Sequence, residues 1–69
     1  MDRIPVVSTS VRAIGYSAQS GVLEIEFNDG SVYNYSGVPQ VEYDELMSSS
    51  SKGRYFAARI KNRYPYSRA

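Results

Sequence analysis

The stretch from Leu23 to Tyr35, LEIEFNDGSVYNY, decides the fold of this chain. Its first five residues, LEIEF, alternate apolar side chains with two glutamates, which is the period-two pattern of a strand with one buried and one exposed face. Asn28, Asp29 and Gly30 follow, and this combination is typical of a tight turn between antiparallel strands. The stretch therefore predicts a β-hairpin.

The turn permits two registers for this hairpin. A two-residue loop would place Tyr33 and Tyr35 on the same face as the glutamates. A longer turn, with Gly30 left-handed at a bulge, would shift the register by one residue, so that Tyr33 faces Ile25 in the core. Tyr35 would then face Leu23. We favour this second register, because a domain of this size has little apolar surface to leave exposed.

Weaker patterns on either side of the hairpin predict the neighbouring elements. Residues 11–16 form a shorter strand before it. After it, Pro39 suits the first turn of a helix, whose apolar stripe consists of Tyr43, Leu46 and Met47. The acidic side chains expected to point away from this stripe are Glu42, Asp44 and Glu45.

A second helix is predicted from Lys52 to Asn62. Ser51, the last of four serines, is expected to cap its start, and Pro65 prevents it from continuing much further. The residues expected on its core face are Gly53, Phe56, Ala57 and Ile60. The predicted fold class is α+β: a three-stranded antiparallel meander followed by two short helices packed on one face. We expect one domain over residues 8–69, with residues 1–7 as an N-terminal extension.

Composition excludes several classes of function. The chain has 69 residues with neither cysteine nor histidine, so disulfides and the usual zinc, haem and iron–sulfur ligands are missing. Nucleophilic catalysis with a histidine base is excluded too, and two glutamates on one exposed strand face, Glu24 and Glu26, are expected to be solvated rather than catalytic. We therefore expect no enzyme, no cofactor and no metal.

The same composition bears on location and assembly. The N-terminus lacks the basic and apolar regions of a signal peptide, and no apolar run approaches the ~20 residues that span a bilayer. We expect a cytoplasmic protein that does not bind membranes. A core this small is often completed by another chain, so we also expect a homo-oligomer.

Charge is concentrated at the C-terminal end of the sequence. Residues 52–69 hold six of the eight cations and no carboxylate, although the net charge is only +1. On the second helix, one face presents Lys52, Tyr55, Arg59 and Arg63. Two like charges one turn apart require an anion between them, which is either a carboxylate of the fold, Glu42 or Glu45, or an anionic ligand.

The start of this helix is either a simple cap or a place for an anionic ligand. Free backbone N–H groups at Ser51, Lys52 and Gly53 offer a seat for phosphate. Tyr64 and Tyr66 flank Pro65, where their rings either cover the core or meet a base. The complete set of candidate ligand-binding residues is Ser51, Lys52, Gly53, Tyr55, Arg59, Arg63, Tyr64 and Tyr66.

Several motifs together resemble the KTSC domain, named after the C-terminal extension of some lysyl-tRNA synthetases. They are Ile14-Gly15-Tyr16, Phe27-Asn28-Asp29-Gly30, Tyr33-Asn34-Tyr35-Ser36-Gly37-Val38-Pro39, Ser51-Lys52-Gly53-Arg54-Tyr55-Phe56 and Tyr64-Pro65-Tyr66. The resemblance implies a stand-alone small protein of the kind found in bacteria and phages. It also implies RNA binding, suggested by the place of the domain in the synthetases, but it brings no agreed site residues.

Three functions follow as hypotheses. The first is a non-enzymatic protein that binds a phosphorylated, nucleotide-like small molecule in the basic and aromatic site. A phage protein of this kind would sequester a signalling nucleotide. The second is an RNA-binding module that uses the same surface. The third is an adaptor that docks an acidic protein on its basic tail. The near-neutral net charge favours the first over the second, because RNA needs a long track of cations.

Overall fold

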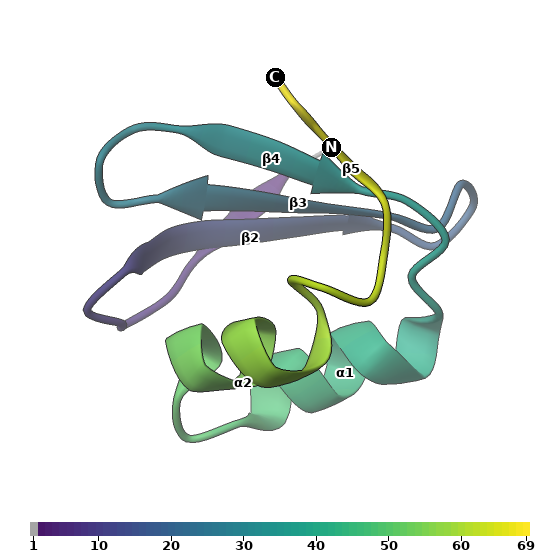
Figure 1. Cartoon of the computed structure of the whole chain (residues 1–69). Coiled ribbons are helices and arrows are strands. Elements are labelled where there is room, and N and C mark those ends of the chain that lie inside the picture. Colours follow the sequence, from purple (N-terminus) through teal and green to yellow (C-terminus); the bar gives the residue numbers. More distant parts are fainter. Residues whose placement is uncertain (1) are drawn as a thin grey trace.

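The computed structural model describes residues 2–69, which form one antiparallel sheet of five strands in the order β1-β2-β3-β4-β5. The strands are β1 (Arg3–Pro5), β2 (Val11–Ser17), β3 (Val22–Phe27), β4 (Val32–Tyr35) and β5 (Tyr66–Arg68). Helices α1 (Gln40–Ser48) and α2 (Lys52–Arg59) lie beside one another under one face of the sheet (Figure 1). The predicted α+β class, with both helices on one face, is confirmed.

The predicted number of strands was wrong, since the sheet has two more at its edges. β1 and β5 are three residues long, consist of exposed residues, and lie at or beside a proline, Pro5 or Pro65. A strand with no buried face has no hydrophobic alternation, so periodicity cannot detect it. Residues 1–7 were expected to precede the domain, but β1 lies within them and belongs to the sheet. The first of these residues, Met1, lies outside the described residues.

The hairpin of β3 and β4 has the favoured register. Ile25 pairs with Tyr33, and Leu23 pairs with Tyr35. Gly30 has a φ of 91°, in the left-handed region, and its N–H donates to the carbonyl of Phe27 at 3.0 Å. The longer turn thus places both tyrosines on the helix-facing side of the sheet, as predicted.

Replacing Gly30 by alanine should lower the free energy of unfolding by about 1–2 kcal/mol, because a Cβ strains a backbone with positive φ. Nothing lies within 4 Å of an added Cβ there, so conformation rather than collision causes the loss. Urea unfolding would measure it. Gly30→Asn is the matched control and should lose less, because asparagine enters this region more readily. Equal stability of Gly30→Ala and wild type would contradict the bulged turn.

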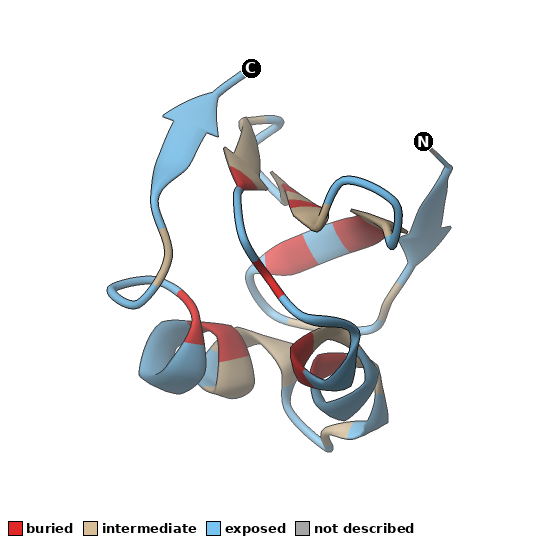
Figure 2. Cartoon of the chain, turned by 90° about the vertical axis from the view of Figure 1, so that its right-hand side faces the viewer, coloured by how far each residue is buried: buried red, intermediate tan, exposed pale blue. Residues whose placement is uncertain are grey.

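The core lies between the sheet and the helices. Its fully buried side chains are Val11, Ile14, Leu23, Ile25, Val38, Leu46 and Ile60. In Figure 2 the buried segments lie where strands and helices face one another, whereas β1 and β5 are exposed along their whole length. Tyr16 joins β2 to the helical layer, since its ring stacks on Tyr43 at 4.6 Å and its hydroxyl donates to the carbonyl of Val38.

Both helices begin close to the predicted residues, but α2 ends earlier than predicted. Ser51 caps α2, accepting a hydrogen bond from the N–H of Arg54. However, α2 ends at Arg59 rather than Asn62, because the N–H of Lys61 closes the last turn on the carbonyl of Phe56. Ala57, expected in the core, is exposed. Neither helix has the length or the apolar character to cross a membrane within residues 2–69.

Candidate functional site

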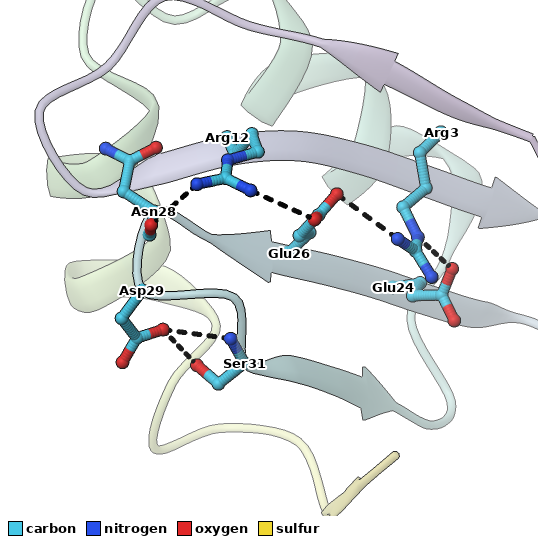
Figure 3. Close-up of polar contacts among 7 residues, drawn as sticks. All are labelled: Arg3, Arg12, Glu24, Glu26, Asn28, Asp29 and Ser31. Atoms are coloured by element: carbon cyan, nitrogen blue, oxygen red, sulfur yellow. Dashed lines mark hydrogen bonds and ion pairs between the residues drawn. The ribbon is translucent and has the colours of Figure 1, made fainter.

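The sheet face opposite the helices carries a network of ion pairs. Arg3 donates to Glu24 at 2.7 Å and to Glu26 at 3.2 Å (Figure 3). Arg12 contacts the other oxygen of Glu26 at 3.7 Å. The hydrogen bond to Glu24 raises the pKa of Arg3. The expectation that these glutamates are simply solvated was incomplete: β1, which the sequence pattern missed, supplies their counter-charge.

The start of α2 is occupied by contacts within the chain. Lys52 donates from Nζ to the carbonyl of Ser49 at 2.8 Å. A Cβ added to Gly53 would lie 2.7 Å from the hydroxyl of Ser10, so this glycine allows the loop before β2 to pass close to the helix. The three residues predicted as a phosphate seat, with Ser51 as the cap, therefore all have structural contacts.

Glu42 of α1 is buried, with 8% of its surface exposed, and it was wrongly expected to point away from the core. Its Oε2 accepts a short hydrogen bond from the hydroxyl of Tyr55, and its Oε1 accepts one from Tyr64 at 3.1 Å. Arg63 lies 3.8 Å from the same Oε1. These four residues form the Glu42 cluster. The carboxylate is tolerated inside because donors from α2 and from the following segment surround it.

Arg59 pairs with neither of the two carboxylates considered for it, Glu42 and Glu45, and no salt bridge to it forms within residues 2–69. Its guanidinium instead lies over the ring of Tyr55, 5.7 Å from the centre. A cleft of about 200 Å³ lies between Arg59 and α1, and its lining contains side chains of both charge signs. The lining residues are Pro39, Val41, Glu42, Glu45, Arg59, Arg63 and Tyr64. The carboxylates reduce its attraction for a phosphate.

The Glu42 cluster predicts an alkaline transition. Burial, together with the hydrogen bonds to Glu42 and Glu45, raises the pKa of Tyr55 to about 12. The neutral phenol is the form that stabilises the fold, so this contribution is complete below pH ~10 and is lost as the pH rises through 12. An NMR titration of the tyrosine ring carbons should show Tyr55 ionising well above a free tyrosine.

Glu42→Gln provides the control for this titration. It removes the negative charge beside the phenol, so the pKa of Tyr55 should fall towards its ordinary value. An unchanged Tyr55 titration in Glu42→Gln would show that the charge of Glu42 does not contribute to the shift.

A larger groove opens on the helix-facing side of the sheet, between the β3–β4 turn and the end of α2. We call it the aromatic groove; it has a volume of about 390 Å³. Its walls are Phe27, Tyr33, Tyr35, Phe56 and Tyr66, with Asp29, Ser31, Lys61 and Asn62 as its polar lining. Size and composition are those of a small-molecule site, with apolar rings and a few polar groups.

The rings of the groove are held by one another. Tyr66 of β5 lies 5.5 Å from both Tyr33 and Tyr35, measured between ring centres. Phe56 of α2 contacts Tyr35 edge-on at 5.3 Å. Arg68 places its guanidinium 5.8 Å from the ring centre of Tyr33. The groove therefore has a preformed aromatic wall with a cation beside it.

The groove's polar groups have defined charges. Hydrogen bonds from the Ser31 hydroxyl and N–H lower the pKa of Asp29, so its carboxylate is ionised at neutral pH. Figure 3 shows these two bonds at the β3–β4 turn. Burial raises the pKa of Tyr35, whose phenol stays neutral. Lys61 supplies a positive charge, and no salt bridge to it forms in the described part of the chain.

The structure divides the eight predicted site residues among separate places. Tyr66 lines the aromatic groove, while Arg59, Arg63 and Tyr64 line the small cleft. Sequence reasoning missed Lys61 and Asn62, because a helix extended to Asn62 would point them away from the core. The early end of α2 turns them to the groove instead. The signal available was Pro65, which already forced the chain to leave the helix nearby.

Five antiparallel strands, two helices on one face and an open aromatic groove define the class of this protein, a small α+β domain with a groove of aromatic side chains on its surface. The chain belongs to the KTSC domain family, whose model matches residues 7–64. A crystal structure of a KTSC domain protein from Yersinia pestis has a TM-score of 0.96 and 37% identity, and covers 99% of this chain and 96% of that one.

Relatives include both stand-alone and fused forms. An uncharacterized protein of Stutzerimonas stutzeri (strain A1501) is 38% identical over 56 residues, which are 81% of this chain and 79% of that protein. A lysine–tRNA ligase of Nostoc sp. (strain PCC 7120) is also 38% identical over 56 residues, but these are only 10% of the ligase. The similarity to the ligase is thus confined to a segment the size of this domain.

Proposed function

We propose that this protein binds a phosphorylated, nucleotide-like small molecule without converting it chemically, and that the base of this ligand enters the aromatic groove. The observation that carries the proposal is the groove itself, a space of about 390 Å³ walled by five aromatic rings and lined also by Lys61. A site of this size encloses a compact ligand rather than a polymer. Binding without conversion sequesters the ligand when the protein is in excess.

Stacking supplies the affinity for the base. Tyr66 is 60% exposed, so its ring has a free surface beside the ring of Tyr33. A base stacked on an aromatic side chain contributes about 1–3 kcal/mol and requires no particular sequence. The ionised carboxylate of Asp29 can accept a hydrogen bond from an amino group of the base or from a ribose hydroxyl.

Cations at the groove supply the affinity for phosphate. Lys61 lines the groove, and Arg68 lies over one of its rings. Both are outside the Glu42 cluster, whose carboxylate already faces Arg63. Charge-assisted hydrogen bonds contribute about 1.5–3 kcal/mol each, so two cations suffice for one or two phosphates.

RNA binding is the second candidate, and the match within lysine–tRNA ligases favours it. The aromatic groove would then receive one base of a single strand, while the exposed cations of α2 follow the backbone. Against it, Glu24 and Glu26 on the opposite sheet face are paired with Arg3 and Arg12, so that face offers a strand no surplus of positive charge. The two candidates differ in salt dependence, because each phosphate contact to a strand releases counterions.

The test is a calorimetric titration with AMP, ADP, short dinucleotides and a ten-nucleotide RNA at several salt concentrations. We expect stoichiometric binding of a mono- or dinucleotide with a shallow salt dependence. RNA binding with a steep salt slope, and no binding of the small nucleotides, would establish the second candidate instead. Absence of binding to every probe at millimolar concentration would refute both.

Two variants locate the site. Lys61→Ala and Tyr66→Ala should each weaken nucleotide binding about tenfold or more, without changing the melting temperature much, because both side chains are at the surface of the groove. Arg54→Ala is the matched control: it removes an exposed cation of α2 that does not line the groove. If Arg59→Ala or Arg63→Ala abolishes binding while Lys61→Ala does not, the ligand occupies the small cleft.

A further inference from the structure

β5 is an edge strand with one free side. Within residues 2–69 it pairs only with β4, through bonds that include Ser36 N–H to the carbonyl of Pro65 and Ala69 N–H to the carbonyl of Val32, both 2.9 Å. Backbone groups of successive residues in a strand point to opposite sides. The N–H and C=O of Tyr66 and Arg68 therefore point away from the sheet, which leaves four groups ready to pair with another strand.

The other edge of the sheet is less suited to pairing. The N–H of Val6 donates to the carbonyl of Arg12 at 3.1 Å, so the same alternation directs the backbone of Arg3 and Pro5 outward from β1. Proline has no N–H to donate, and it blocks the addition of a strand. Of the two edges, β5 is the one with a full set of donors and acceptors.

We propose that a second copy of this chain pairs antiparallel with β5, about a two-fold axis at Ser67. In this register Tyr66 of each copy lies opposite Arg68 of the other, and all four outward backbone groups of each strand are paired. β5 is self-complementary, because at each end of the paired strands the ring of Tyr66 lies opposite the guanidinium of Arg68. The same pairing of residue types exists within the chain, where Arg68 lies over Tyr33.

The second copy thereby completes the aromatic groove; this part of the inference rests on the proposed function. The side chains of Tyr66 and Arg68 share one sheet face with Tyr35 and Tyr33, their partners on β4. Arg68 of the second copy therefore lies beside Tyr66 on the groove side of the sheet. Each groove gains a cation for phosphate at the ring on which a base stacks.

The pairing also links ligand binding to assembly. A three-residue strand buries little surface, and two Arg68 side chains on neighbouring diagonal positions repel one another. The dimer is therefore weak by itself. An anionic ligand that neutralises these charges binds the dimer better than the monomer, so it must shift the equilibrium towards the dimer.

Sedimentation analysis and amide hydrogen exchange, each with and without ADP, test the inference. We expect a reversible monomer–dimer equilibrium, a larger dimer fraction with ADP, and slower exchange of the Tyr66 and Arg68 amides at high protein concentration. Arg68→Pro removes an outward N–H without touching the bonds to β4, and it should be monomeric. Arg68→Ala keeps that N–H and should dimerise with a reduced response to ADP.

A wild-type chain that stays monomeric at millimolar concentration with and without ADP would overturn the inference. So would a dimer that survives in Arg68→Pro, or one in which the Tyr66 and Arg68 amides exchange as fast as in the monomer. ADP bound by a monomer would overturn the inference and leave the proposed function standing. A β5 dimer that binds no nucleotide would do the reverse.

Discussion

Replacing Leu46 by alanine should remove about half of the stability of this domain. Leu46 is 0% exposed and joins α1 to the core of Ile14, Leu23 and Ile25. Its truncation leaves a cavity in a core that cannot collapse fully, at a cost of about 2–5 kcal/mol. A chain of this length has only about 3–10 kcal/mol of stability, at ~0.05–0.15 kcal/mol per residue. Urea unfolding followed by circular dichroism measures the loss.

Val41→Ala is the matched control for this prediction. It truncates an aliphatic side chain on the same helix that is 60% exposed, so it should change the free energy of unfolding by less than about 0.5 kcal/mol. A Leu46→Ala variant as stable as Val41→Ala would mean that α1 is not docked on the sheet in solution.

The second large effect is expected from Glu42→Ala, which should cost about 1–3 kcal/mol. The change leaves the hydroxyl of Tyr64 without its acceptor in a partly buried place and leaves Tyr55 only its longer bond to Glu45, and unsatisfied polar groups there are costly. The loss should be accompanied by loosening of the C-terminal segment, since Tyr64 leads directly into Pro65 and β5. Thermal unfolding and amide exchange of residues 64–69 would measure both.

Glu45→Ala controls for the removal of a carboxylate from the same helix. Glu45 is exposed and shares only one hydrogen bond, at 3.1 Å, with Tyr55, so this variant should lose less than about 0.5 kcal/mol. Similar losses for the two variants would show that Glu42 is not the centre of the cluster.

The contrast between these two glutamates also bears on the ligand site. Glu42 takes Arg63 and two of the predicted tyrosines into an internal network, which explains why the charges of the C-terminal segment are not all available. Lys61 and Arg68 lie outside that network and next to aromatic rings. The groove, with Lys61 and Arg68, is therefore a better candidate for binding phosphate than the Glu42 cluster.

Local patterns predicted the central part of the fold well. Alternation in LEIEF and the turn at Gly30 predicted β3, β4 and their register, because a strand with one buried face must place its apolar residues two apart. The cap at Ser51 was also predicted, since its hydroxyl acts on a neighbour in the chain. The KTSC resemblance, which the family match confirms, rested partly on the same stretches and partly on motifs around Gly15 and Pro65.

The candidate site was predicted only in part, because its residues meet through distant contacts. Basic and aromatic character in residues 52–69 was visible in the sequence, and Tyr66 was among the predicted contacts. Lys61 was not, since a helical wheel assumes that the helix continues. Tyr33 and Tyr35 were assigned to the core, and they are also a wall of the groove.

By itself, the sequence determined the α+β class, the hairpin and its register, the cap of α2, and the concentration of cations and rings at the C-terminal end. These features depend on neighbours along the chain or on one buried face, and the spacing of residue types along the sequence therefore predicts them. Only the tertiary structure decided that β1 and β5 extend the sheet, that Glu42 is buried among donors, and that an aromatic groove opens beside Lys61. Each of these requires contacts between segments far apart in the sequence, and such contacts produce no periodic pattern of residue types.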